Sequence, residues 1–113
     1  LGHSQCGGIR ALMESSVLGN RDSFISSWMS IVEDAKNKVN AEHPDLNLDE
    51  KCRLCEQEAL QISLQNLLGF PWIKSRVEAK KLFLHAWHFD LNSGQLTEFT
   101  PEHDTTILYH YKP

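Results

Sequence analysis

The stretch "LGHSQCGGIRAL", residues 1–12, carries the change of pattern on which the fold class depends. Leu1 and Gly2 have the character of the last residues of a strand. From Cys6 onward, apolar residues such as Ile9 and Leu12 recur at a helical spacing, with a glycine pair in the first turn. The sequence therefore predicts a strand-to-helix junction here, and we expect the body of the strand to lie before Leu1.

Three further helices are predicted downstream. One begins at Asp22 or Ser23 and ends before Pro44, because the residue before a proline avoids helical geometry. Its apolar stripe consists of Phe24, Trp28, Ile31, Val32, Ala35 and Val39. The longest helix begins near Asn47 or Asp49 and is capped by Gly69. A brief helix covers residues 71–81, with Pro71 in its first turn.

The spacing of apolar residues changes from a helical to a strand-like pattern after this helix. Residues 82–90, "LFLHAWHFD", read as a strand; residues 91–94 are a turn, and residues 95–100 form an antiparallel partner. The tail from Asp104 adds a short strand or simply docks. A sheet with so few strands would leave the apolar faces of the helices unburied. We therefore expect an α/β fold, with a mostly parallel sheet flanked by helices and a C-terminal strand pair. Residues 1–113 would form the C-terminal portion of a single domain.

Composition excludes several classes of partner. The 113 residues carry a net charge of −4, so we expect no non-specific attraction to nucleic acid or anionic membranes. No apolar run approaches the roughly 20 residues that span a bilayer, and the first residues do not resemble a signal peptide. Three cysteines do not suggest a disulfide framework. Reduced thiols, available to bind metal, favour a cytoplasmic location.

The predicted junction brings together side chains that bind metals. The carboxyl end of a strand is where α/β proteins place ligands. His3 would lie there, and Cys6 would lie in the first turn of the helix, where the helix dipole favours a thiolate. Imidazole and thiolate are both zinc ligands. Gly7 and Gly8 would let a backbone N–H approach a small anion. By itself, this spacing more often reflects a buried cysteine and a histidine bonded to the backbone than a metal site.

A second cysteine pair offers an alternative. Cys52 and Cys55 form a C-x-x-C at the start of the long predicted helix. Together with His3 and Cys6 they would complete a Cys₃His set, which is typical of a small structural zinc-binding interaction domain without catalysis. The pair could also be redox-active, but simple packing of both cysteines in the core is the favoured interpretation.

Longer motifs resemble one family. The string "GHSQCGGI", residues 2–9, is similar to the second metal motif of the β-class carbonic anhydrases, Gly-His-Ser-x-Cys-Gly-Gly. The string "CEQEALQISLQNLLGFPWI", residues 55–73, resembles the family's long helix, and "LFLHAWHFDLNSGQL", residues 82–96, its closing strand pair. Ala86 replaces a common glycine. Phe89 replaces a tyrosine used for non-catalytic bicarbonate binding in one subgroup, which points to the plant-like subgroup.

This resemblance implies a zinc enzyme that reversibly hydrates carbon dioxide to bicarbonate (a lyase, carbonate dehydratase) and forms homodimers or higher homo-oligomers. His3 and Cys6 would be two of three protein ligands, and Gly7 would direct its backbone N–H at bicarbonate. The third ligand would come from a Cys-x-Asp-x-Arg motif before Leu1, without which the chain alone would be inactive. Two thiolates make zinc a weaker Lewis acid than three histidines do, so we expect activity to rise through weakly alkaline pH.

Other polar and aromatic residues are assigned structural roles. Glu56 matches a family position and is expected to be buried and paired. His85 and His88 are three apart on a strand, so they are expected on opposite faces. The three tryptophans are expected in the core or at a subunit interface.

Overall fold

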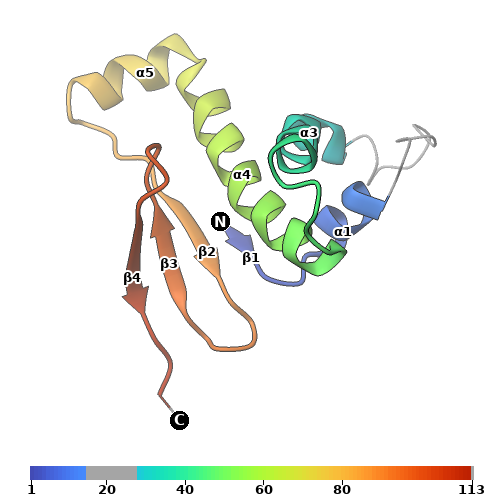
Figure 1. Ribbon diagram of the computed structural model, residues 1–113. Helices are drawn as coiled ribbons and strands as arrows, with labels where there is room; N and C mark the ends of the chain where they lie inside the picture. Colours follow the sequence, from blue (N-terminus) through green and yellow to red (C-terminus); the bar gives the residue numbers. More distant parts are fainter. Residues whose placement is uncertain (15–27, 113) are drawn as a thin grey trace.

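The computed structural model describes residues 1–14 and 28–112. The elements run in the order β1 (Gly2–His3), α1 (Gly7–Glu14), η1 (Ser30–Val32), α3 (Glu33–Glu42), α4 (Leu48–Leu68), α5 (Pro71–Glu78), β2 (Ala86–Phe89), β3 (Leu96–Phe99) and β4 (Thr105–Tyr109) (Figure 1). The predicted caps at Asp22 or Ser23, and Phe24 in the predicted stripe, lie outside the described residues.

The described strands form one mixed sheet in the order β1-β2-β3-β4. β1 pairs parallel to β2, whereas β2–β3 and β3–β4 are antiparallel. The α/β class and the C-terminal strand pair are confirmed. A mostly parallel sheet was expected, and the described residues contain one parallel pair of it, β1–β2. The helices between these two strands provide the crossover that parallel pairing requires, whereas the short turns before β3 and β4 impose antiparallel pairing.

The long helix α4 organises the packing (Figure 1). Its first half packs against α1 and α3, and its second half packs on the sheet. The larger core cluster contains Ile9, Leu12, Met13, Met29, Ala35, Val39, Cys52 and Cys55. A smaller cluster of Leu60, Ala86 and Phe99 lies between α4 and the sheet. Because α1 begins directly after β1, this packing holds the junction between the strand and the helix in place.

Both ends of α4 lie at the capping residues that the sequence predicted. Asn47 is the N-cap: its side chain accepts a hydrogen bond from the Glu50 N–H, and the Glu50 side chain accepts one from the Asn47 N–H. This reciprocal capping box satisfies two backbone donors that the first turn leaves free. Gly69 caps the other end, as predicted, although its φ of −69° is a right-handed conformation open to any residue.

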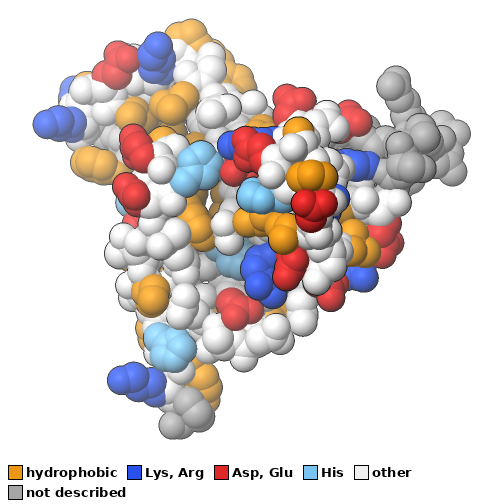
Figure 2. All heavy atoms as spheres, in the orientation of Figure 1, with side chains coloured by type: hydrophobic (Ala, Val, Ile, Leu, Met, Phe, Trp, Pro, Cys, Tyr) orange, Lys and Arg blue, Asp and Glu red, His pale blue; other side chains and the backbone are white. Residues whose placement is uncertain are grey.

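The tryptophans are not in the core of this chain. Trp28, Trp72 and Trp87 are 66%, 63% and 38% exposed. α5 buries none of its residues, and Figure 2 shows apolar side chains at the surface over this helix. Of the two expected alternatives, the core is therefore not met within the described residues, and for Trp72 the reason is that α5 buries none of its side chains. A subunit-interface role for the tryptophans stays a prediction. Within the described ranges, no helix combines the length and apolar character needed to cross a membrane.

Candidate metal centre

The residues that follow β1 are tied to the end of β2. His3 is the register partner of Phe89. The Ser4 N–H donates to the Phe89 carbonyl oxygen at 2.9 Å, and the Ser4 Oγ accepts from the Leu91 N–H at 2.7 Å. These bonds extend the parallel pairing by one residue beyond the strand. They place His3 at the carboxyl edge of the sheet, where the sequence predicted it.

A tight turn returns the chain from His3 to the start of α1. Gln5, at φ 54°, adopts the left-handed conformation that non-glycine residues rarely take. Its side chain donates to Asn92 Oδ1 at 3.5 Å, across to the turn after β2. The left-handed residue turns the backbone sharply enough for Cys6 to follow His3 into the same cavity.

The His3 ring is held by a backbone acceptor. Its Nδ1 lies 2.8 Å from the Ser4 carbonyl oxygen. When Nδ1 carries the proton and donates to that carbonyl, Nε2 keeps a free lone pair. Histidines that ligate metals typically donate their second ring nitrogen to a carbonyl or carboxylate in this way. The geometry therefore fits a metal ligand.

Cys6 occupies the position before the first residue of α1. Its carbonyl oxygen accepts from the Arg10 N–H at 3.0 Å, which is the first bond of the helix. Its half-buried side chain lies at the N-terminal end of the helix, where the backbone dipole favours negative charge. A thiol in this position can reach a metal ion in the neighbouring cavity, and the deprotonated form is the one that binds.

His3 and Cys6 line one cavity of about 230 Å³. Most of its wall is apolar and includes Ile9, Met29 and Leu60. Glu56, from α4, is the carboxylate on this wall. A small cavity with mostly apolar walls, an imidazole and a thiol suits a small, weakly polar reactant near a metal.

The two glycines after Cys6 differ in their surroundings. A Cβ at Gly8 would lie 3.0 Å from Met29 Sδ, so the absence of a side chain there lets α1 pack closely. A Cβ at Gly7 would meet no heavy atom within 4 Å. Gly7 thus borders open space at the first turn of α1, where backbone N–H groups have no partner within the helix. That the Gly7 backbone N–H points at bicarbonate stays a prediction.

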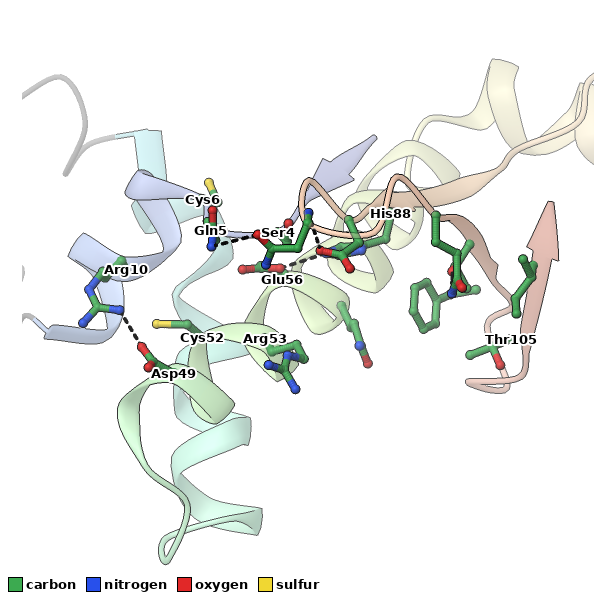
Figure 3. A pocket seen from close by; sticks show the side chains of 17 residues that line it. Ser4, Gln5, Cys6, Arg10, Asp49, Cys52, Arg53, Glu56, His88 and Thr105 are labelled. Atoms are coloured by element: carbon green, nitrogen blue, oxygen red, sulfur yellow. Dashed lines mark hydrogen bonds and ion pairs between the residues drawn. The ribbon is translucent and has the colours of Figure 1, made fainter. Parts of the chain in front are cut away.

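A larger polar cavity of about 990 Å³ lies between α4 and the sheet (Figure 3). The Glu56 carboxylate, which belongs to the walls of both cavities, bonds to His88 Nε2 at 2.8 Å. The two side chains are only 5% and 10% exposed. The expectation that Glu56 is buried and paired is confirmed. Its partner His88, which sequence reasoning did not find, connects α4 to the central strand β2.

His85 and His88 lie on opposite faces, as the strand period predicted. His88 is buried, whereas His85 is exposed and pairs with Glu98 of the neighbouring strand at 2.7 Å. They cannot ligate one ion together.

The cysteine pair of α4 is part of the core. Burial raises the pKa of the Cys55 thiol to about 12 and also raises the pKa of Cys52. Burial therefore favours the protonated form of both thiols. Among the described residues, no three histidine, cysteine or acidic side chains come close enough to hold a metal together. The Cys₃His arrangement is thus not formed there, whereas packing of both cysteines in the core is confirmed.

The fold of this chain is shared with a solved structure. A solved structure of the β-carbonic anhydrase CcaA matches with a TM-score of 0.81, at 23% identity, over 96% of this chain and 49% of that chain. Residues 1–96 match the family model described as carbonic anhydrase. The chain belongs to the carbonic anhydrase family, as its motifs predicted.

Curated relatives from Arabidopsis thaliana narrow the family to the β class. Beta carbonic anhydrase 3 is 36% identical over 111 residues, which are 96% of this chain and 43% of that protein. Beta carbonic anhydrase 5, chloroplastic, is 35% identical over 91% of this chain and 34% of that protein. Beta carbonic anhydrase 6, mitochondrial, is 33% identical over 98% and 39%. The chain therefore spans less than half the length of each of these relatives.

Proposed function

We propose that the protein containing this chain catalyses the reversible hydration of carbon dioxide to bicarbonate and a proton, with zinc as cofactor. Family membership supports carbonic anhydrase chemistry in general. The observation that carries the proposal for this chain is the junction between β1 and α1, where His3 and Cys6 line the same small cavity. The donor set, one imidazole and one thiol, is the kind that zinc prefers.

Each residue of the junction has a distinct task in this proposal. Through Nε2 and Sγ, His3 and Cys6 would hold zinc together with a cysteine from a Cys-x-Asp-x-Arg motif elsewhere in the protein. When bound, zinc supplies a Lewis acid that makes water nucleophilic near neutral pH. The Ser4 carbonyl fixes the His3 ring and leaves Nε2 for the metal.

The apolar walls of the cavity would interact mainly with carbon dioxide, and the start of α1 mainly with bicarbonate. Apolar side chains such as Ile9 and Leu60 accommodate uncharged carbon dioxide and limit the entry of water. Bicarbonate is an anion, and the free N–H groups at the first turn of α1 favour it. Gly7 would supply one of these groups without a side chain in the way. The site thus combines an apolar wall with one anion-binding end.

The test uses the natural protein that carries this chain. We expect His3→Ala and Cys6→Ser each to remove most bound zinc, measured by elemental analysis, and to abolish carbon dioxide hydration measured by stopped flow. The control His43→Ala changes an exposed histidine after α3 and should keep both. Full zinc content in both site variants would refute the assignment.

The same assay separates the catalytic site from the structural alternative. A structural Cys₃His site would lose zinc when Cys52 and Cys55 are both replaced by serine. The catalytic proposal expects zinc to be retained in this double variant, provided that circular dichroism shows it to be folded.

Assembly and location complete the proposal. The exposed apolar residues of this chain, Trp28 and Trp72 among them, support a homodimer or a larger homo-oligomer. A cytoplasmic location stays a prediction from cysteine usage; two of the relatives are named chloroplastic and mitochondrial.

A further inference from the structure

The loop that joins the two candidate metal ligands contains an unfavourable backbone conformation. Only Ser4 and Gln5 separate His3 from Cys6. Gln5 has a φ of 54°, in the left-handed region that non-glycine residues adopt only at a cost in free energy. Such a conformation persists where the surrounding structure imposes it. Contacts from outside the loop must therefore hold the imidazole and the thiol in their relative positions.

These contacts come from the turn that follows β2, residues 90–95. The Leu91 N–H donates to Ser4 Oγ at 2.7 Å, and Gln5 Nε2 donates to Asn92 Oδ1 at 3.5 Å. Each hydrogen bond joins residues 87 positions apart in the sequence. Ser4, Gln5 and Asn92 all line the polar cavity shown in Figure 3. Both residues between the ligands are thus bonded to one distant turn, and the bond to Ser4 is the shorter.

The turn is braced by hydrogen bonds of its own. The Asp90 carboxylate accepts from the Ser93 hydroxyl at 2.7 Å and from the Asn92 N–H at 3.2 Å. Hydrogen bonding, above all from Ser93, lowers the pKa of Asp90 and keeps its carboxylate charged. The Ser4 hydroxyl is a further donor to this carboxylate. The hydroxyl therefore accepts from the backbone of the turn and donates to the acid that braces it.

Ser4 connects the turn to the ligands through three groups. Its N–H donates to the Phe89 carbonyl oxygen at 2.9 Å, and its hydroxyl bonds to the turn. Its own carbonyl oxygen lies 2.8 Å from His3 Nδ1. A rotation of Ser4 would therefore move the acceptor that orients the imidazole. It would also displace Gln5 and, with it, the thiol of Cys6.

We propose that Ser4 is a positioning residue for the two metal ligands: its hydroxyl ties the loop of residues 3–6 to the turn of residues 90–95, so that the imidazole and the thiol are in place before the ion binds. This inference rests on the proposed function, because it concerns the same two ligands. Groups that are fixed in advance lose less conformational entropy on binding. A hydroxyl suits this position because one oxygen atom both accepts and donates.

The test measures the zinc affinity of the natural protein by competition with a chromophoric chelator. Ser4→Ala is expected to raise the zinc dissociation constant by about 10–100-fold, the usual effect of removing a group that orients a ligand. Ser4→Thr keeps the hydroxyl and should keep most of the affinity. Ser4→Val has the shape of threonine without the hydroxyl and should lose affinity as alanine does. The control Ser93→Ala removes a hydroxyl bonded to Asp90 within the turn and should bind zinc as the natural protein does.

A second measurement separates positioning from a general loss of stability. With cobalt(II) in place of zinc, the visible absorption of the saturated protein reports the geometry of the ligands. The spectrum should change in Ser4→Ala and Ser4→Val and stay the same in Ser4→Thr and Ser93→Ala, with circular dichroism recorded for each. An unchanged affinity and spectrum in folded Ser4→Ala, equal behaviour of the threonine and valine variants, or an equal loss in Ser93→Ala would overturn the proposal.

Failure of this proposal can be told apart from failure of the proposed function. If the natural protein binds zinc and the Ser4 variants bind it equally well, the positioning role is refuted and the proposed function stands. If the natural protein binds no zinc, the proposed function is refuted, and the positioning role with it.

Discussion

At the scale of single residues, Gly94 is the position where the backbone most clearly requires glycine. Its φ is +70°, and a Cβ there would lie 2.7 Å from Tyr111 Cβ. Gly94→Ala is expected to reduce the free energy of unfolding by about 1–3 kcal/mol, from backbone strain and crowding together. Urea unfolding measures the change. Gly7→Ala, where a Cβ meets open space, is the control, and an equal loss in both variants would contradict this explanation.

Cys55 gives a prediction on pH. Burial raises its pKa to about 12 in the folded chain, from the ordinary value of 9.0. As pH rises above about 9, the unfolded state loses the thiol proton first. The stability that this buried thiol contributes below that pH is therefore lost between pH 9 and 12.

The matching experiment compares two core variants. Cys55→Ala should show a smaller fall in the free energy of unfolding between pH 8 and pH 10 than the natural protein shows. Val39→Ala leaves a cavity in the same core cluster without a titrating group, so its fall with pH should equal that of the natural protein. Identical pH slopes in all three proteins would contradict the role of Cys55.

At the scale of elements, the start of α4 depends on its capping box. Asn47→Ala removes the side-chain acceptor for the Glu50 N–H and is expected to cost about 1 kcal/mol. Ser63→Ala, inside the same helix, removes only a hydroxyl bonded to the Ala59 carbonyl and should change the stability far less. Thermal unfolding followed by circular dichroism distinguishes the two. The cap would be shown irrelevant if both variants melted alike.

The link between α4 and β2 is a buried polar pair. Glu56→Ala would leave His88 buried without its 2.8 Å partner and is expected to destabilise the fold by about 3 kcal/mol. Glu56→Gln keeps an oxygen acceptor and should cost less. Chemical unfolding measures both, and a larger loss for glutamine than for alanine would refute the account.

At the scale of the whole molecule, the proposed activity has a pH dependence. Two thiolate ligands reduce the charge that zinc presents, so the nucleophile forms at higher pH than in a three-histidine site. Under the proposed function, the rate of carbon dioxide hydration by the natural protein should rise between pH 6 and pH 9 in stopped-flow assays. A flat profile over this range would contradict a Cys₂His centre.

Much of the architecture could be predicted because local signals agreed with it. Asn47, Gly69 and Pro71 marked helix ends correctly, since caps and prolines act through neighbouring backbone atoms. The exposure of Trp28 and Trp72 could not be predicted, because an apolar stripe does not reveal whether another element covers it.

The sequence by itself determined the strand-to-helix junction, the order of elements and the candidate ligands His3 and Cys6, because each depends on residues that are close along the chain. Only the tertiary structure showed that Ser4 bonds to the end of β2, that Glu56 meets His88, and that α5 buries none of its side chains. These features join residues more than 30 positions apart or depend on what covers a surface. Local spacing carries no information about such contacts, which packing alone decides.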